Sequence, residues 1–142
     1  MNEFQCIIAS SDKIFYDGPC LSLVVPAWDG EYAFMAKHQE CVAAVSIGTL
    51  RVKKPDGSVV LGVCGLGLVC FEKNRAVVLV DTIERPEDID EVQARRAKEQ
   101  AEEELKEAKS QQEYNASQAA LARAIYRLSA RGKYVHDQKL RG

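Results

Sequence analysis

The most reactive side chains in this sequence are five cysteines, which could serve as nucleophiles or as metal ligands. They are Cys6, Cys20, Cys41, Cys64 and Cys70. Their spacing contains no CxxC pair of the kind used in zinc sites and redox motifs, and their odd number does not fit a complete disulfide framework. Most stand among apolar neighbours and none has an evident activating base, so we expect reduced thiols that pack in a core.

His38 and the glycine-rich segment 62–67 are the next candidates for a reaction or binding site. The sequence offers only one other histidine, His136, so a surface role for His38 at an interface is favoured over catalysis or metal binding. Segment 62–67 has the glycines of a phosphate-binding loop but lacks the Lys-Ser/Thr ending and a following helix. We predict strand bends or bulges there instead.

The size and charge of the chain exclude several classes of protein. Its 142 residues fit one ordinary domain, or a small domain with an appendage, rather than a large multidomain enzyme. The net charge of −2 argues against binding to nucleic acid through overall positive charge. No apolar run is long enough to span a bilayer, and residues 1–6 lack the features of a signal or transit peptide. We therefore expect no direct membrane insertion and no export.

The composition changes sharply after Pro86, which predicts two domains, 1–86 and 87–142. All four prolines and all five cysteines lie in the first part, and charged residues rise from 18 of 86 before the break to 22 of 56 after it. Residues 87–131 contain neither glycine nor proline. The first part therefore has the pattern of β structure and the second that of α-helices.

The first part carries short runs of β-branched and aromatic residues separated by turn residues, as in a β sandwich or barrel. Leu50 and Val52 alternate with charged residues, which is typical of a strand with one face in water. Segments 55–57 and 72–75 have the positions of hairpin turns. The predicted strands are 4–9, 13–16, 20–25, 31–34, 49–53, 59–64, 67–71 and 75–80.

Two helices are predicted in the second part. Pro86 and the acids that follow it are typical of a helix start, since proline tolerates the first turn and acids complement the positive end of the helix dipole. A narrow stripe then runs to about Lys109 and consists of Ala94, Ala97, Ala101, Leu105 and Ala108. The second helix is expected to stop near Gly132, and its apolar face is formed by Ser117, Leu121, Ile125 and Leu128. A short connection makes the pair an antiparallel hairpin.

The two predicted helices carry opposite charge and share a thin apolar seam. Residues 87–113 have 10 acids and 5 bases, a net −5, whereas 114–142 have one acid and six bases, a net +5. The bulky seam residues are Ile89, Val92, Leu105, Leu121, Ile125 and Leu128. Their burial contributes on the order of 10 kcal/mol, less than the entropy lost on ordering the two helices. We therefore hypothesise that the hairpin docks weakly and acts as a conformational switch.

The order of these features resembles the epsilon subunit of F-type ATP synthases over essentially the whole chain. No single motif is specific for this family, but the order in which the motifs follow one another along the chain is specific. The segments that carry the resemblance are Ile14-Phe-Tyr-Asp-Gly18, Pro26-Ala-Trp-Asp-Gly-Glu31, His38, Gly48-Thr-Leu-Arg-Val52, Gly65-Leu-Gly67 and Val77-Val-Leu-Val-Asp81. The resemblance implies a β sandwich of about ten short strands followed by an antiparallel α-helical hairpin.

The resemblance implies a noncatalytic rotor subunit in the central stalk of ATP synthase. The β sandwich, 1–86, would bind the gamma subunit and the c-ring, and so couple ion-driven rotation of the ring to ATP synthesis. The helices, 87–142, would form a mobile regulatory domain that inhibits ATP hydrolysis at the alpha/beta hexamer. The protein would be a peripheral component at the cytoplasmic face of the bacterial plasma membrane.

The resemblance also assigns interface residues. By position, Glu31 and His38 match residues at the interface with the c-ring and gamma. Arg123, Arg127 and Arg131 match the basic stretch of the second helix that contacts an acidic segment of the beta subunit. The resemblance implies no catalytic residue and no metal ligand.

Some members of the family also bind ATP through an Ile/Leu-Asp-x-x-Arg-Ala motif in the first helix, together with basic residues of the second. Here Gln93 stands where the motif has arginine, so a fixed positive charge for phosphate is lost. The weakened site that remains consists of Ile89, Asp90, Ala94, Arg123 and Arg127. The sequence therefore predicts no required cofactor and keeps ATP as a candidate regulatory ligand, with Arg95 or Arg96 as a substitute for the missing arginine.

Two other hypotheses stay open at this point. The chain could be an independent β-sandwich module whose helices recruit a different protein, or a cysteine-dependent enzyme with a thiol of low pKa. Binding of nucleic acid by the basic second helix is disfavoured, because the acidic first helix competes with phosphate.

Overall fold

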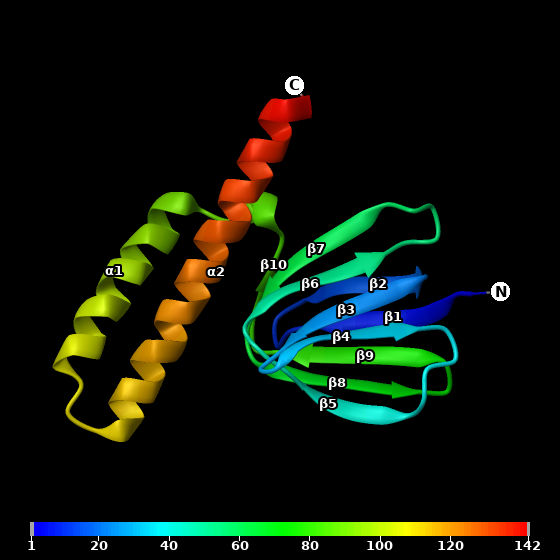
Figure 1. Ribbon diagram of the computed structural model, residues 1–142, viewed down its shortest axis with the longest axis horizontal. Coiled ribbons are helices and arrows are strands. Elements are labelled where there is room, and N and C mark those ends of the chain that lie inside the picture. The colour runs from blue at the N-terminus through cyan, green and yellow to red at the C-terminus, as the bar shows by residue number, and fades with distance from the viewer. Residues whose placement is uncertain (1, 142) are drawn as a thin grey trace. The chain divides into compact units, whose positions relative to one another are not determined.

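Ten β-strands, a short 3-10 helix and two α-helices follow one another along the chain (Figure 1). The structure is a computed structural model that describes residues 2–141. It divides into two units, a β unit of residues Met1–Glu84 and a helical unit of residues Arg85–Gly142. The predicted β sandwich of about ten short strands followed by two antiparallel helices is confirmed.

The β unit consists of two five-stranded sheets, which we call sheet A and sheet B. Sheet A has the order β2-β1-β9-β8-β5, and its strands are β1 (Phe4–Ala9), β2 (Ile14–Cys20), β5 (Cys41–Val45), β8 (Gly67–Glu72) and β9 (Arg75–Val80). Sheet B has the order β10-β7-β6-β3-β4, and its strands are β3 (Ser22–Ala27), β4 (Gly30–Met35), β6 (Gly48–Lys53), β7 (Val59–Cys64) and β10 (Ile83–Glu84). All neighbouring strands are antiparallel except β1 and β9, which run parallel.

The core of the β unit is formed by alternate residues of each strand, which share one face of the sheet. In β6, Leu50 and Val52 are fully buried and the charged residues beside them are exposed, as predicted for a strand with one face in water. Three phenylalanines form the aromatic centre. The ring centroid of Phe71 lies 5.4 Å from that of Phe4 and 5.9 Å from that of Phe34. Aromatic pairs at these distances add to the stabilisation from burial alone.

The structure differs from the sequence prediction in two strands and one boundary. Strands β5 and β10 lie outside the predicted segments, because β5 is built largely from small residues and β10 has only two residues. The predicted boundary at residue 20 is wrong, since Cys20 ends β2, opposite Phe4, and β3 starts at Ser22. Asp17-Gly18-Pro19 has the composition of a turn but lies in β2, an edge strand where proline is tolerated.

The glycine-rich segment 62–67 forms strand ends and a turn, in agreement with a structural role. Gly62 lies in β7, and Gly67 is the first residue of β8. A Cβ atom at Gly67 would overlap the carbonyl oxygen of Leu79 on the neighbouring strand β9. The close approach of the two backbones therefore requires glycine at this position.

The helical unit consists of the 3-10 helix η1 (Pro86–Asp88), α1 (Glu91–Glu107) and α2 (Gln111–Arg141). The regular helix begins at Glu91 rather than at Pro86, because Asp90 caps it. The carboxylate of Asp90 accepts a hydrogen bond from the backbone N–H of Gln93 at 3.1 Å. The predicted end of the second helix near Gly132 is wrong. One interior glycine costs only about 1 kcal/mol relative to alanine, which is too little to end a long helix.

Helices α1 and α2 lie side by side and run antiparallel (Figure 1). The buried side chains of the helical unit are mostly small, and they are Pro86, Ile89, Ala94, Ala101, Ser117 and Ala124. Val92 and Ile125, which the sequence assigned to the seam, are instead 60% and 47% exposed. The buried side of α2 passes through Ser117 and Ala124, and Ile125 points about 100° away from Ala124.

Candidate functional site

Glu31 lies near the start of β4, an edge strand of sheet B, beside the turn that joins β3 to β4. Its carboxylate accepts a hydrogen bond from Nη1 of Arg51 on β6 at 2.9 Å. Both side chains are about half exposed, so this ion pair lies at the surface. The turn also presents Trp28, the only tryptophan of the chain, which is 86% exposed. Exposed tryptophan is among the residue types that contribute most to protein interfaces.

His38 follows the other end of β4, in a turn closed by a hydrogen bond from its N–H to the carbonyl oxygen of Met35 at 3.1 Å. The ring centroid of His38 lies 4.8 Å from that of Phe34 and 5.4 Å from that of Phe71. Its Nδ1 lies 2.7 Å from the carbonyl oxygen of Gln39, which can only accept a hydrogen bond. Nδ1 therefore carries the hydrogen, and Nε2 is the acceptor of the neutral ring.

Glu31 and His38, which the sequence assigned to one interface, lie at opposite ends of β4. Glu31 and Met35, at the start of the His38 turn, are four positions apart along the extended strand, on the order of 13 Å. The two side chains therefore do not form a single cluster. One partner would contact both only by covering the length of this edge strand.

The outer face of sheet A carries a continuous apolar surface that the sequence analysis missed, which we call the sheet A patch. Two rows of paired residues cross β5, β8, β9 and β1, with Val42, Cys70, Val77 and Ile7 in one row and Ala44, Leu68, Leu79 and Ala9 in the other. The side chains of Val42, Leu68 and Leu79 are 68%, 54% and 58% exposed. Exposed Ile14 on β2 extends the second row, opposite Ala9. Neither row contains a charged residue on these four strands, and the first row ends on β2 at the exposed Asp17, opposite Ile7.

A signal for this patch was present in the sequence. Segments Gly67–Glu72 and Arg75–Val80 are apolar at nearly every interior position, whereas a strand with one solvated face alternates. Strands that are apolar on both faces are typical of sheets covered on both sides. A contiguous apolar surface that remains exposed is typical of an interaction site.

Arg123, Arg127 and Arg131 follow one another at four-residue intervals on α2, so they lie along one side of the helix. All three side chains are half-buried. Nη1 of Arg131 donates a hydrogen bond to the carbonyl oxygen of Glu87 at 3.0 Å, and its guanidinium lies 5.5 Å from the ring centre of Tyr134. In this conformation Arg131 is therefore engaged by η1 of the same unit.

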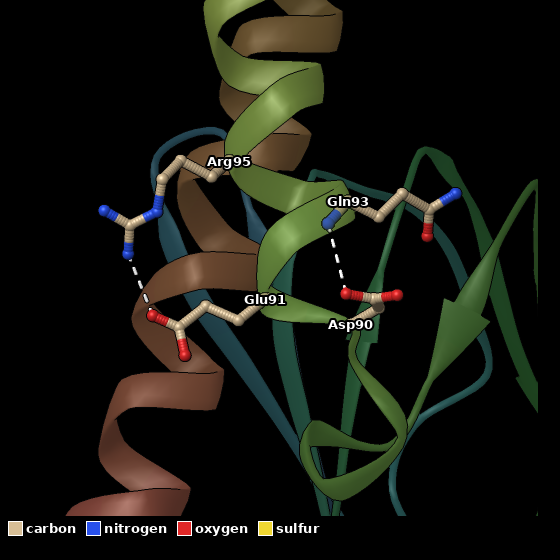
Figure 2. A network of polar contacts seen from close by, with 4 residues as sticks. All are labelled: Asp90, Glu91, Gln93 and Arg95. Carbon is tan, nitrogen blue, oxygen red and sulfur yellow. Dashed lines mark hydrogen bonds and ion pairs between the residues drawn. The ribbon is translucent and has the colours of Figure 1, made fainter.

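Figure 2 shows the start of α1, where the candidate ATP motif lies. The carboxylate of Asp90 accepts a hydrogen bond from the N–H of Gln93, so this residue serves as the helix cap. Ile89 and Ala94 are almost completely buried. These three positions thus have structural roles in the helical unit that need no ligand.

The side chain of Arg95 lies on a different side of α1 from position 93, where the motif has its arginine. Residues two apart on an α-helix point about 200° apart, and Nη2 of Arg95 pairs with Glu91 at 2.8 Å. Figure 2 shows Arg95 and Glu91 on one side of the helix and the side chain of Gln93 on the other. Arg96 lies one turn after Gln93 and is the remaining candidate substitute.

The five cysteines are free thiols, and Cys6, Cys20 and Cys64 are buried. Burial raises the pKa of Cys64 to about 12. A hydrogen bond between Cys6 and Cys20, together with burial, raises the pKa of Cys6, and the same bond lowers the pKa of Cys20, which is fully buried. Reactive thiols combine a low pKa with solvent access, and none of these three does. Cys41 and Cys70 are half-buried.

Neither a metal centre nor a membrane span is found in the part of the chain that the structure describes. Within residues 2–141, no group of three or more His, Cys, Asp or Glu side chains is arranged to hold a metal ion. Over the same residues, no helix has both the length and the apolar character needed to cross a bilayer.

Both parts of the chain match domains of a known family. Residues 3–86 match the domain described as "ATP synthase, Delta/Epsilon chain, beta-sandwich domain". Residues 87–132 match "ATP synthase, Delta/Epsilon chain, long alpha-helix domain".

Individual relatives and solved structures agree with the family match. The ATP synthase epsilon chain of Ruminiclostridium cellulolyticum is 39% identical over 92% of this chain and 96% of the relative. That of Caldicellulosiruptor saccharolyticus is 38% identical over 90% of this chain and 93% of the relative. A chain of the Euglena gracilis mitochondrial ATP synthase has the same fold, with a TM-score of 0.73 at 17% identity over 84% of this chain and 76% of that chain. This chain therefore belongs to the delta/epsilon family of ATP synthase chains and, as an epsilon chain, is a noncatalytic subunit.

Proposed function

We propose that this epsilon chain is a rotor subunit with two distinct functional parts. The β-sandwich domain, 1–86, binds the gamma chain and the c-ring, and couples ion-driven rotation of the ring to ATP synthesis. The helical domain, 87–142, is mobile and inhibits ATP hydrolysis at the alpha/beta hexamer. The single observation that carries the proposal is the sheet A patch, since it gives the β domain a surface suited to a protein partner.

The sheet A patch is assigned to the gamma chain. A contiguous apolar surface that crosses four strands without a charge is unusual on a protein that works alone, and it is typical of the centre of an interface. A sheet face lacks the concave shape that a small-molecule ligand needs. A second protein is therefore the occupant that fits.

The substitution Leu68→Glu tests this assignment, because it places a charge in the centre of the patch and leaves the core intact. We expect the affinity for the gamma chain, measured by titration calorimetry, to fall by about 100-fold. Val59→Glu is the matched control, since Val59 is 54% exposed, as Leu68 is, but lies on the outer face of sheet B. Loss of binding in Val59→Glu with normal binding in Leu68→Glu would move the interface to sheet B.

The β3–β4 turn is assigned to the c-ring and the His38 turn to gamma, because Glu31 and His38 lie at opposite ends of β4. The intrinsic fluorescence of Trp28 reports on the contact between the β3–β4 turn and the c-ring without labelling, since Trp28 is the only tryptophan of this chain. We expect its emission to move to shorter wavelength, and quenching by iodide to fall, when the chain is assembled with gamma and a c-ring. Emission that stays the same would exclude the turn from that interface.

The helical domain has the charge needed to contact an acidic surface. The arginine row of α2 lies in a segment, 114–142, with one acid and six bases. In the observed arrangement, Arg131 binds a carbonyl oxygen of η1. An acidic segment of the hexamer would replace that contact if it offered a few kcal/mol of differential affinity, which is within the range of conformational switches.

Hydrolysis of ATP by the assembled complex tests the inhibitory role. We expect deletion of residues 87–142 to raise the rate, and alanine substitution of Arg123, Arg127 and Arg131 to reproduce most of the increase. The control removes three bases in and after α1, namely Lys98, Lys106 and Lys109. A rate that does not respond to the deletion would rule out an inhibitory tail and leave the binding assignments standing.

ATP is kept as a regulatory ligand of low affinity. Asp90 is engaged as a helix cap, and position 93 lacks the cation that a phosphate would bind. We expect calorimetry with millimolar ATP to give little heat for this chain and measurable binding for Gln93→Arg. Strong binding without the substitution would assign the role of phosphate partner to Arg96.

The cellular location follows from these contacts. A chain held by gamma and the c-ring is a peripheral component at the cytoplasmic face of the bacterial plasma membrane. We expect it to fractionate with membranes that contain the complex and to leave them when Leu68→Glu breaks the contact with gamma.

A further inference from the structure

The turn between β8 and β9 consists of two residues in the left-handed conformation. Lys73 and Asn74 have φ angles of 51° and 58°, and the flanking residues Glu72 and Arg75 are paired. Positive φ at both central positions is typical of the type I′ turn, whose twist matches that of the two strands. Asparagine tolerates this conformation, so the backbone alone would explain its presence.

The side chain of Asn74 has a second role that the turn does not require. Its Oδ1 accepts a hydrogen bond from the backbone N–H of Lys37 at 2.7 Å. Its Nδ2 donates to the carbonyl oxygen of Glu3 at 3.0 Å. One carboxamide thus joins the residue before β1 to the turn after β4, and only this orientation of the amide satisfies both partners.

Lys37 is the residue of the His38 turn that most needs such support. Its φ of 65° places a side chain with a Cβ in the left-handed region, which is unfavourable for residues other than glycine and asparagine. The hydrogen bond from its N–H to Asn74 holds the backbone in that conformation. The next residue, His38, closes the turn onto Met35.

The same hairpin also contacts the His38 ring directly. Phe71, on β8, lies 5.4 Å from the ring of His38, and Asn74 lies three residues further along the hairpin. The His38 ring therefore packs on Phe71 as well as on Phe34, and the backbone of the preceding residue, Lys37, is held by its hydrogen bond to Asn74. The contacts with Phe71 and Asn74 both come from outside β4.

We infer that Asn74 is a positioning residue for the partner-facing surface at His38. It acts through the backbone of Lys37 and sets the place and the Nε2 direction of a ring it does not touch. The functional part of this inference rests on the proposed function, in which His38 contacts gamma. The positioning itself rests only on the contacts within the β unit.

The variant Asn74→Gly separates the side chain from the turn, because glycine keeps the left-handed backbone and removes both hydrogen bonds. In the full chain we expect hydrogen exchange at the Lys37 amide to accelerate at least about tenfold. The NMR signals of the His38 ring should also move, because they are shifted by Phe34 and Phe71. Affinity for the gamma chain should fall about tenfold.

Two further variants serve as controls. Lys73→Gly changes the same turn but keeps the two Asn74 hydrogen bonds to Glu3 and Lys37, so it should leave the His38 signals and the Lys37 exchange rate unchanged. Asn74→Asp keeps the acceptor for the Lys37 N–H and should retain most of the amide protection. If Asn74→Gly gives Lys37 exchange and His38 signals like those of the unmodified chain, the positioning role is wrong.

Binding distinguishes the positioning role from the proposed function. If the His38 signals move in Asn74→Gly while both this variant and His38→Ala bind gamma normally, Asn74 positions His38 but His38 is not a gamma contact. If His38→Ala weakens binding and Asn74→Gly weakens it to a similar degree, both statements are supported.

Discussion

The β unit and the helical unit are stabilised in different ways. The β unit buries three phenylalanines and many branched aliphatic side chains, with Phe4, Phe34 and Phe71 at its centre. The helical unit buries little besides Ile89, three alanines, a proline and Ser117. Because the stabilisation from burial grows with apolar area, the β unit is expected to hold far more stability per residue.

This difference suits the proposed division of roles. A platform that binds gamma permanently benefits from a close-packed core, which resists deformation. An arm that changes partners must come from the less stable part of a protein, where few contacts have to be broken. The thin seam of the hairpin is therefore consistent with the switch hypothesis, which stays a prediction.

The largest expected effect comes from removing the aromatic centre of the β unit. Phe71→Ala should cost about 3 to 5 kcal/mol of unfolding free energy, because it leaves a cavity and removes contacts with the rings of Phe4, Phe34 and His38. The matched variant in the helical unit is Leu105→Ala, at a half-buried position, with an expected loss below about 2 kcal/mol.

Hydrogen exchange shows whether each substitution lowers the stability of the β unit or of the helical unit. In Phe71→Ala the amides of β1, β8 and β9 should lose protection, while those of α1 and α2 keep the rates of the unmodified chain. Equal protection of the helices and the β core before any substitution would contradict both the comparison and the switch hypothesis.

Two glycines give an opposite pair of predictions. Gly67→Ala should destabilise the β unit by about 1 to 3 kcal/mol, because the new Cβ overlaps the Leu79 carbonyl and the strands must shift. Gly132→Ala should stabilise α2 by about 1 kcal/mol, since nothing lies within 4 Å of that Cβ and alanine is the better helix former. Thermal unfolding followed by circular dichroism measures both. If both substitutions raised the unfolding free energy, or both lowered it, the backbones at Gly67 and Gly132 would not differ in the constraint that the comparison assumes.

The fold was largely predictable because local chemistry and tertiary structure agree over most of the chain. Alternation in β6, the turn at Pro55-Asp56-Gly57 and the change of composition at Pro86 each point to the element that is observed. The failures fall where local signals are weak or are overridden. β10 has two residues and pairs only through β7, and α2 passes through Gly132 because a long helix absorbs the cost.

The candidate sites were predictable only where one element contains the whole pattern. The three arginines of α2 were assigned by the family resemblance, and only their alignment along one side of the helix follows from the four-residue spacing. The Glu31–Arg51 pair joins residues 20 positions apart, and their contact depends on strand order, which spacing does not reveal. Predicting the sheet A patch would require the order of four strands. It crosses the parallel pair of β1 and β9, which are neighbours in the sheet but lie near opposite ends of the β unit's sequence.

A smaller effect is expected at the start of α1. Asp90→Ala removes the cap of the helix and should cost about 1 kcal/mol, seen as reduced helical signal and faster exchange in the first turn. Asp90→Asn can still accept from the Gln93 N–H and should restore most of the loss. If Asp90→Ala lowered the stability of the β unit as well, the two units would not be independent in the way the comparison assumes.

The smallest effect on stability should come from the exposed ion pair of sheet B. Arg51→Gln should change the unfolding free energy by less than about 1 kcal/mol, because both side chains are about half exposed and solvent screens the pair. Its effect on assembly should be larger, because Glu31 loses the partner that orients its carboxylate. Lys53→Gln is the control, since it removes the same charge two residues further along the same outer face of β6. Contact with the c-ring is measured by Trp28 fluorescence, and we expect it to weaken in Arg51→Gln but not in Lys53→Gln, with a smaller difference between the two variants at high salt. That result would show that an ion pair with little effect on stability still contributes to binding. Equal weakening in both variants would mean that only the overall charge of this face matters.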